Sequence, residues 1–172
     1  GKGKAPNFDD IPEIDAHGLI LAPGFIDLHV HGAMGYEAMD ATPEALSGMA
    51  RYYAQHGTTA FLAATWTESR ARILAALQAV ASSLGRQVNG ATLLGVYLEG
   101  PYLNTSKCGA QNTEYIRRAD RDEALEFLAQ DVIRLMVLAP EFEENLWLVE
   151  ECVRRGIAVS AGHTSATYDQ MK

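Results

Sequence analysis

Two histidines separated by a single residue, His29 and His31, are the side chains of this sequence best placed to do chemistry. They end the segment 26–31, in which apolar and polar residues alternate as they do in a β-strand. The alternation puts Asp27 on the face of the two histidines and the apolar side chains on the opposite face, against covering helices. Two imidazoles spaced in this way can bind one divalent metal ion, and the ion removes the cost of burying them unpaired. Two core histidines satisfied by backbone carbonyls are the alternative, which the histidine pair beside Asp27 disfavours.

Two further candidate ligands, Glu99 and His163, end other apolar runs of the sequence. Glu99 is followed at once by a turn signal, Gly100-Pro101. Strict alternation would put His163 on the face of Val159, so we expect a break at Gly162 that turns its side chain toward the other ligands. Carboxylate and imidazole donors together suit zinc or another first-row divalent metal. A structural carboxylate that caps an amide or pairs with a lysine is the alternative for Glu99.

The other histidines and the two cysteines lack a comparable pattern. His17 precedes a glycine in an expected turn, and His56 falls in the last turn of an expected helix, where the helix dipole favours a positive charge. Cys108 and Cys152 have no metal-binding or disulfide spacing, and a reducing compartment would keep both as thiols. We expect none of the four to take part in chemistry.

The segments around the candidate ligands alternate between β-rich runs and helical patterns, which is typical of βα units around a parallel sheet. The expected strands are 25–31, 58–66, 92–99, 132–139 and 157–163, and the expected helices are 42–56, 68–84, 120–129 and 143–155. A further helix is expected to begin near Tyr168. All four candidate ligands then fall at the carboxyl ends of strands, where barrel enzymes carry their active sites.

A closed barrel of eight βα units usually takes about 250 residues. The 172 residues therefore predict an α/β fold with a partial (β/α)8 TIM-like barrel, in which about five of the eight units are present. A doubly wound sheet is the alternative, but it usually carries a glycine-rich phosphate turn after its first strand, where this chain has His29-Val30-His31-Gly32. We expect residues 1–22 to be a lead-in and residues 23–172 to be the first part of the barrel.

The overall charge and hydropathy exclude several classes of partner. The net charge is −8 and the sequence pI is about 5.0, so a nucleic-acid-binding surface is not expected. No run approaches the ~20 apolar residues of a membrane helix, and the N-terminal residues lack a signal-peptide core. We expect a cytoplasmic protein that binds a small molecule.

Three segments resemble a known family of enzymes. The run PGFIDLHVHG at residues 23–32 resembles the opening signature of the amidohydrolase superfamily. The runs LEGPYLN at 98–104 and KCGAQ at 107–111, together with AGHTSA at 161–166, resemble the N-acetylglucosamine-6-phosphate deacetylases of that superfamily. The likeness runs from about residue 14 to residue 172 and covers under half of the family's usual length.

The resemblance implies a role for each matching residue. Glu99 and His163 match metal ligands of the family, whereas His29 and His31 match a pair that adds a second metal in some members, so one or two ions are implied. Zinc is the ion that the resemblance implies first, and iron or another first-row metal is the alternative. Ala110 and Gln111 match a loop that contacts the sugar. Many members have a histidine where this chain has Gln111. A glutamine can still donate or accept a hydrogen bond but does not titrate, so the resemblance implies a hydrogen bond to substrate there and excludes proton transfer.

The resemblance also implies the reaction and the parts that are not in this sequence. A divalent ion activates water and polarises an acetyl carbonyl, a carboxylate moves the proton, and N-acetylglucosamine 6-phosphate yields acetate and glucosamine 6-phosphate. The general-base Asp, another metal-binding histidine and most phosphate contacts are expected beyond Lys172. We therefore expect the 172 residues alone to be inactive, residues 1–22 to include a remnant of a small β domain, and the full-length protein to be a homodimer.

Two other functions remain open from the sequence. A dihydroorotase-like or dipeptidase-like amidohydrolase would share His29 and His31. Those enzymes generally place a lysine or a different ligand on the third or fourth strand, whereas this chain has Glu99 at the end of the third. A scaffold without catalysis would have no need to bury four candidate ligands.

Overall fold

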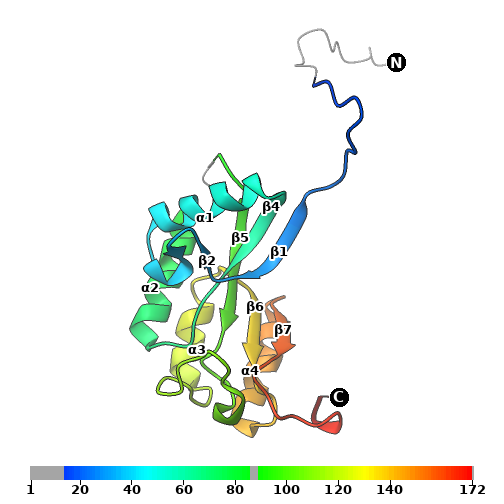
Figure 1. The fold of residues 1–172 in the computed structure, drawn as a ribbon. Coiled ribbons are helices and arrows are strands. Elements are labelled where there is room, and N and C mark those ends of the chain that lie inside the picture. Colours follow the sequence, from blue (N-terminus) through cyan, green and yellow to red (C-terminus); the bar gives the residue numbers. More distant parts are fainter. Residues whose placement is uncertain (1–13, 86–88, 172) are drawn as a thin grey trace, which may run out of the picture.

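The computed structural model describes residues 14–85 and 89–171, and a curled parallel sheet of five strands forms the centre of this part (Figure 1). The strands are β1 (Phe25–Val30), β4 (Thr58–Ala64), β5 (Thr92–Glu99), β6 (Ile133–Leu138) and β7 (Ala158–Ala161). Their spatial order, β1-β4-β5-β6-β7, is also their order along the chain. Each strand therefore lies beside its successor, as in a (β/α)8 barrel, and the expected partial barrel is confirmed.

Helices follow the strands in the alternation that the sequence predicts. The α-helices of the described residues are α1 (Pro43–Gln55), α2 (Arg70–Ser83), α3 (Arg121–Leu128) and α4 (Glu143–Arg154). Capping side chains set three of the beginnings: Thr42 Oγ1 accepts a hydrogen bond from the N–H of Ala45, Ser69 Oγ accepts one from the N–H of Arg72, and Asp120 Oδ1 accepts one from the N–H of Glu123. The expected strands and helices are confirmed, with small differences at their ends. None of the described helices is long and apolar enough to cross a membrane.

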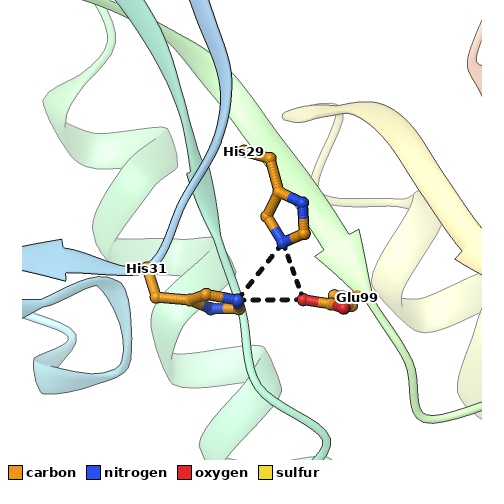
Figure 2. A group of neighbouring side chains, drawn as sticks. All are labelled: His29, His31 and Glu99. Carbon is orange, nitrogen blue, oxygen red and sulfur yellow. Dashed lines mark hydrogen bonds and ion pairs between the residues drawn. The ribbon is translucent and has the colours of Figure 1, made fainter. Parts of the chain in front are cut away.

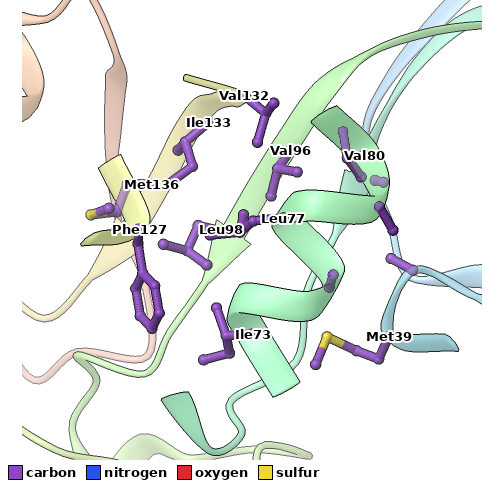
Figure 3. Close-up of a cluster of buried hydrophobic side chains, with 14 of the residues drawn as sticks. Met39, Ile73, Leu77, Val80, Val96, Leu98, Phe127, Val132, Ile133 and Met136 are labelled. Atoms are coloured by element: carbon purple, nitrogen blue, oxygen red, sulfur yellow. The ribbon is translucent and has the colours of Figure 1, made fainter. Parts of the chain in front are cut away.

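The hydrophobic core lies between the sheet and the helices (Figure 3). Val96 and Leu98 of β5 are buried in one cluster with Ile73 and Leu77 of α2. Because side chains alternate along a strand, Glu99 points away from α2, to the inner face of the curled sheet. The packing of β5 against α2 therefore sets the direction of Glu99.

A β-bulge interrupts the pairing of β1 with β4. Asp27 pairs with Phe61 and Val30 with Ala63, so three steps along β1 match two along β4. Phe61 and Ala63 are both core residues, and paired residues of neighbouring strands point to the same side of a sheet. Asp27 therefore lies on the helix side. The expectation that Asp27 shares the face of His29 is wrong, because the extra residue of the bulge breaks the alternation.

The bulge also changes the surroundings of the apolar residues of β1. Ile26 is 62% exposed and Leu28 is 49% exposed, so the expectation that they pack against helices is wrong for this chain. Asp27 lies instead near Tyr53 of α1. Burial raises the pKa of Tyr53 to about 12, and the nearby charge of Asp27 contributes to this rise. β1 is an edge strand of the described sheet, with β4 on one side only.

Several short elements follow the strands and were not expected. They are the hairpin of β2 (Gly32–Ala33) and β3 (Tyr36–Glu37), and the 3-10 turns η1 (Ala38–Asp40) and η2 (Thr105–Lys107). Where a further helix was expected near Tyr168, the described residues contain only the 3-10 turn η3 (Asp169–Met171). Most of the expected lead-in, residues 1–13, lies outside the described residues, and residues 14–24 contain one turn and no strand.

Candidate metal centre

Three of the four expected ligands, His29, His31 and Glu99, meet at the carboxyl ends of β1 and β5 (Figure 2). His29 Nε2 and His31 Nε2 each lie 2.9 Å from Glu99 Oε2, and the two nitrogens are 3.3 Å apart. His163 Nε2 approaches the other carboxylate oxygen, Oε1, at 2.7 Å. The structure therefore brings all four side chains together, with the carboxylate of Glu99 at the centre.

The chain turns sharply directly after Glu99, and Gly100 makes this turn feasible. Gly100 has a φ of +78°, in the left-handed region that favours glycine, and a Cβ at this position would overlap with Thr67 Oγ1. The backbone N–H of Glu99 donates a hydrogen bond of 3.2 Å to Thr65 Oγ1, which ties the end of β5 to the end of β4. The position of Glu99 is thus fixed by the hydrogen bond to Thr65 and by the turn at Gly100.

His163 reaches the cluster from a loop and not from a strand. β7 ends at Ala161, and the left-handed residue is His163 itself, with a φ of +50°. The expected break in the alternation is present, but the unusual backbone angle falls one residue later than Gly162. Gly162 serves packing instead, because a Cβ there would come 2.5 Å from Val137 Cγ1.

Aromatic rings pack against His29, which lies in β1, and against His31, which directly follows it. The ring of His31 stacks on Trp66 with centroids 3.7 Å apart and planes 11° apart, and the ring of His29 stacks on Tyr97 at 4.2 Å and 19°. Stacking limits the rotation of each imidazole, so the Nε2 atoms stay directed at Glu99. The sequence reasoning missed both rings. Two signals could have found them, since Trp66 ends an expected strand at the same end of the barrel and Tyr97 shares the face of Glu99 on β5.

Glu99 is ionised in this environment. Burial by itself would raise the pKa of its carboxyl group, since the side chain is only 6% exposed. Hydrogen bonds to His31, His163 and His29 outweigh the burial and lower the pKa from 4.5 to about 2. The centre therefore contains one negative charge surrounded by three imidazoles.

The donor set fits a divalent first-row metal ion. The separations of 2.9 and 3.3 Å between the donors of Figure 2 are close to the edge of a tetrahedron around zinc, about 3.4 Å for bonds of about 2.1 Å. His163 Nδ1 lies 2.9 Å from the carbonyl oxygen of Lys107, which can only accept, so this contact places the hydrogen on Nδ1. His163 Nε2 is then the ring atom that could bind an ion beside Glu99. His31 Nδ1 is buried without a hydrogen-bond partner in the described residues. Nε2 is therefore the atom of that ring that could bind the ion.

The two expected substrate contacts lie beside this centre. The exposed Ala110 lines a cavity of about 190 Å³ together with Trp66, whose ring stacks on His31. Gln111 is buried, and its Oε1 accepts a hydrogen bond of 2.7 Å from the backbone N–H of Thr67. In the described residues the Gln111 side chain is therefore hydrogen-bonded to the segment after β4 and to none of the four candidate ligands.

Comparison with known proteins places this geometry in a family. The model of the Amidohydrolase family matches residues 20–172. The N-acetylglucosamine-6-phosphate deacetylase of Vibrio furnissii is 42% identical over 154 residues, which are 88% of this chain and 39% of that protein. The N-acetylgalactosamine-6-phosphate deacetylase of Escherichia coli O157:H7 is 35% identical over 164 residues, which are 94% of this chain and 43% of that protein.

A solved structure agrees with these relatives. The crystal structure of N-acetylglucosamine-6-phosphate deacetylase from Pasteurella multocida superposes with a TM-score of 0.85 at 33% identity, over 94% of this chain and 44% of that one. The chain thus spans less than half the length of each of these proteins. The family model covers nearly all of the chain, and the chain belongs to the amidohydrolase family.

Proposed function

We propose that Glu99, His163, His29 and His31 bind a divalent metal ion, with zinc as the first choice and iron or another first-row metal next. One buried carboxylate carries this proposal, because it contacts two imidazoles at the end of β1 and a third from the loop after β7. Because each oxygen of Glu99 faces its own imidazole group, the centre can hold one ion or two. An ion bound here would supply Lewis acidity for the hydrolysis of an amide.

We further propose that the protein containing this chain hydrolyses N-acetylglucosamine 6-phosphate to glucosamine 6-phosphate and acetate. The names of the Vibrio furnissii and Pasteurella multocida proteins support this substrate. The relative from Escherichia coli O157:H7 is named for the galactosamine epimer, so N-acetylgalactosamine 6-phosphate is the second candidate. The residues of this chain would hold the ion and form one wall of the sugar site.

The wall of the sugar site would be the loop that carries Ala110 and Gln111. Ala110 lines the cavity next to Trp66. Gln111 uses its Oε1 to hold Thr67, and its Nε2 has no hydrogen-bond partner among the described residues. We therefore propose that this amide nitrogen donates to the sugar and takes no part in proton transfer.

The test is acetate release by the natural protein that contains this chain, loaded with Zn²⁺ and supplied with each of the two sugar phosphates. We expect turnover of the glucosamine derivative, and we expect Glu99→Gln to abolish turnover and lower the bound metal. Glu114→Gln, which changes an exposed carboxylate on the loop after β5, should keep both. No acetate from either sugar in the metal-loaded protein would contradict the reaction, whereas full metal content in Glu99→Gln would contradict the centre.

A further inference from the structure

The carboxylate of Glu141 joins two loops at the carboxyl end of the sheet. Glu141 follows β6, and its Oε1 accepts hydrogen bonds from Asn104 Nδ2 and from the backbone N–H of Ser165, both at 2.7 Å. Its Oε2 accepts a hydrogen bond from Thr164 Oγ1. Asn104 lies in the loop after β5, and Thr164 and Ser165 lie in the loop after β7. One side chain therefore ties together the segments that follow three neighbouring strands.

The loop after β5 also holds His163 at two points. The backbone N–H of Asn104 donates a hydrogen bond of 2.9 Å to the carbonyl oxygen of His163, and His163 Nδ1 donates one of 2.9 Å to the carbonyl oxygen of Lys107. The φ of His163 is +50°, and a residue with a Cβ keeps such an angle only where its surroundings hold it. The conformation of His163 therefore depends on how the two loops are held together.

We propose that Glu141 is a positioning residue, which joins the loops after β5 and β7 and so keeps His163 Nε2 directed at Glu99. The inference rests on the proposed function, in which His163 is a metal ligand. Among the described residues, the hydrogen bonds of Glu141 go to Asn104, Thr164 and Ser165, and none goes to Glu99 or to an imidazole. Its effect on the metal passes entirely through the backbone and ring of His163.

The other two imidazoles are held in a different way. His29 stacks on Tyr97 and His31 stacks on Trp66, and neither ring pair is hydrogen-bonded to Glu141 in the described part of the chain. Loss of the Glu141 carboxylate should therefore displace His163 alone. A general loosening of the fold would displace all three rings, and this difference separates positioning from a merely structural role.

The chemistry of the carboxylate explains which replacement can keep the contacts. Burial raises the pKa of Glu141, but the hydrogen bonds from Thr164 and Asn104 outweigh it, and the pKa lies below its usual value. The ionised group accepts all three donors. A glutamine in its place keeps an oxygen for Asn104 and Ser165, and its amide nitrogen can donate to the Thr164 hydroxyl. An alanine keeps none of the three contacts.

The experiment compares Glu141→Ala, Glu141→Gln and a control, Glu150→Ala, in the natural protein that contains this chain. Glu150 is an exposed carboxylate on α4. Zn²⁺ affinity is measured by competition with a chelator, and the visible spectrum of the Co²⁺-loaded protein reports the ligand set. Residues that orient a metal ligand typically contribute a factor of about 10 to 100 in affinity. We expect a loss of that size in Glu141→Ala, recovery of most of it in Glu141→Gln, and the native value in Glu150→Ala.

Two reference variants decide the other outcomes. The Co²⁺ spectrum of Glu141→Ala should shift toward that of His163→Ala, and a native spectrum with native Zn²⁺ affinity would overturn the inference. If Glu141→Ala does not fold, Thr164→Val removes one donor and should show a smaller loss in the same direction, and native affinity in it would equally overturn the inference.

The proposed function can fail while the positioning role holds. Native affinity in His163→Ala would remove His163 from the metal centre. Spectra of the metal-free protein labelled with ¹⁵N-histidine would then decide the inference alone. We expect Glu141→Ala to change the ring signals of His163 and to leave those of His29 and His31 in place, and unchanged His163 signals would overturn it.

Discussion

Glu99 Oε1 and His163 Nε2 lie 2.7 Å apart although 64 residues separate them in sequence. The other oxygen of the same carboxylate contacts His29 and His31, so Glu99 is the member of the cluster that touches all the others. Glu99 ends a buried strand, whereas His163 belongs to a loop that two other segments hold. The candidate centre thus joins a rigid ligand to one whose position depends on its neighbours.

Replacement of the candidate ligands should lower metal affinity in a definite order. Glu99→Gln and His163→Ala should cost more than His29→Ala, because Glu99 contacts every imidazole and the His29 side chain is 45% exposed, where water can replace it as a ligand. Competition with a chelator measures the three affinities. A larger loss in His29→Ala than in Glu99→Gln would contradict this order.

Gln111→Ala should destabilise the fold and leave the metal bound. The change removes the acceptor of the buried N–H of Thr67, and an unsatisfied buried donor costs about 1–3 kcal/mol. Denaturant unfolding measures the free energy, and elemental analysis measures the metal. Thr113→Ala, at an exposed position two residues away, is the matched control and should change neither. Metal loss in Gln111→Ala would contradict the separation of this residue from the ligands.

Asn145→Leu should destabilise the loops around the site more than any exposed substitution. Asn145 is fully buried, its Oδ1 accepts from the N–H of Ala119, and its Nδ2 donates to the carbonyl oxygens of Tyr102 and Ala139. Loss of these bonds leaves the N–H of Ala119 and the carbonyl oxygen of Ala139 without these partners, at about 1–3 kcal/mol for each, whereas the carbonyl oxygen of Tyr102 still accepts from the N–H of Ala139. The free energy of unfolding is the measurement, with Leu146→Ala on the exposed side of α4 as the control. A change below about 1 kcal/mol would be inconsistent with a fully bonded amide.

Cys152 should resist thiol reagents at pH 8 in the folded protein. Burial raises the pKa of its thiol to about 11, so the reactive thiolate is scarce until the pH approaches that value. Cys108 is only half-buried and should react first. Titration with a chromogenic disulfide should therefore give one fast thiol, Cys108→Ser should remove it, and unfolding should expose the second. Rapid reaction of Cys152 in the native state would contradict its buried position.

The sequence determined the features that depend on local periodicity. The apolar run that ends in Glu99 placed this carboxylate at the end of β5, and the expected bounds of that strand agree with the structure. The spacing of His29 and His31 indicated that both point the same way, and the structure brings their Nε2 atoms to 3.3 Å. Alternation along a strand and capping at a helix start are properties of neighbouring residues, so they can be read without the fold.

Only the tertiary structure decided the features that depend on distant partners. The bulge in β1 moved Asp27 to the helix side, because the register of β1 is set by its pairing with β4 and not by its own sequence. Trp66 and Tyr97 became supports of the imidazoles through stacking across strands. The left-handed conformation of His163 and its contact with Lys107 require loops that are 56 residues apart in sequence to meet. A hydrogen bond between such loops leaves no periodic trace in the sequence, and therefore the role of Glu141 becomes visible only in the folded chain.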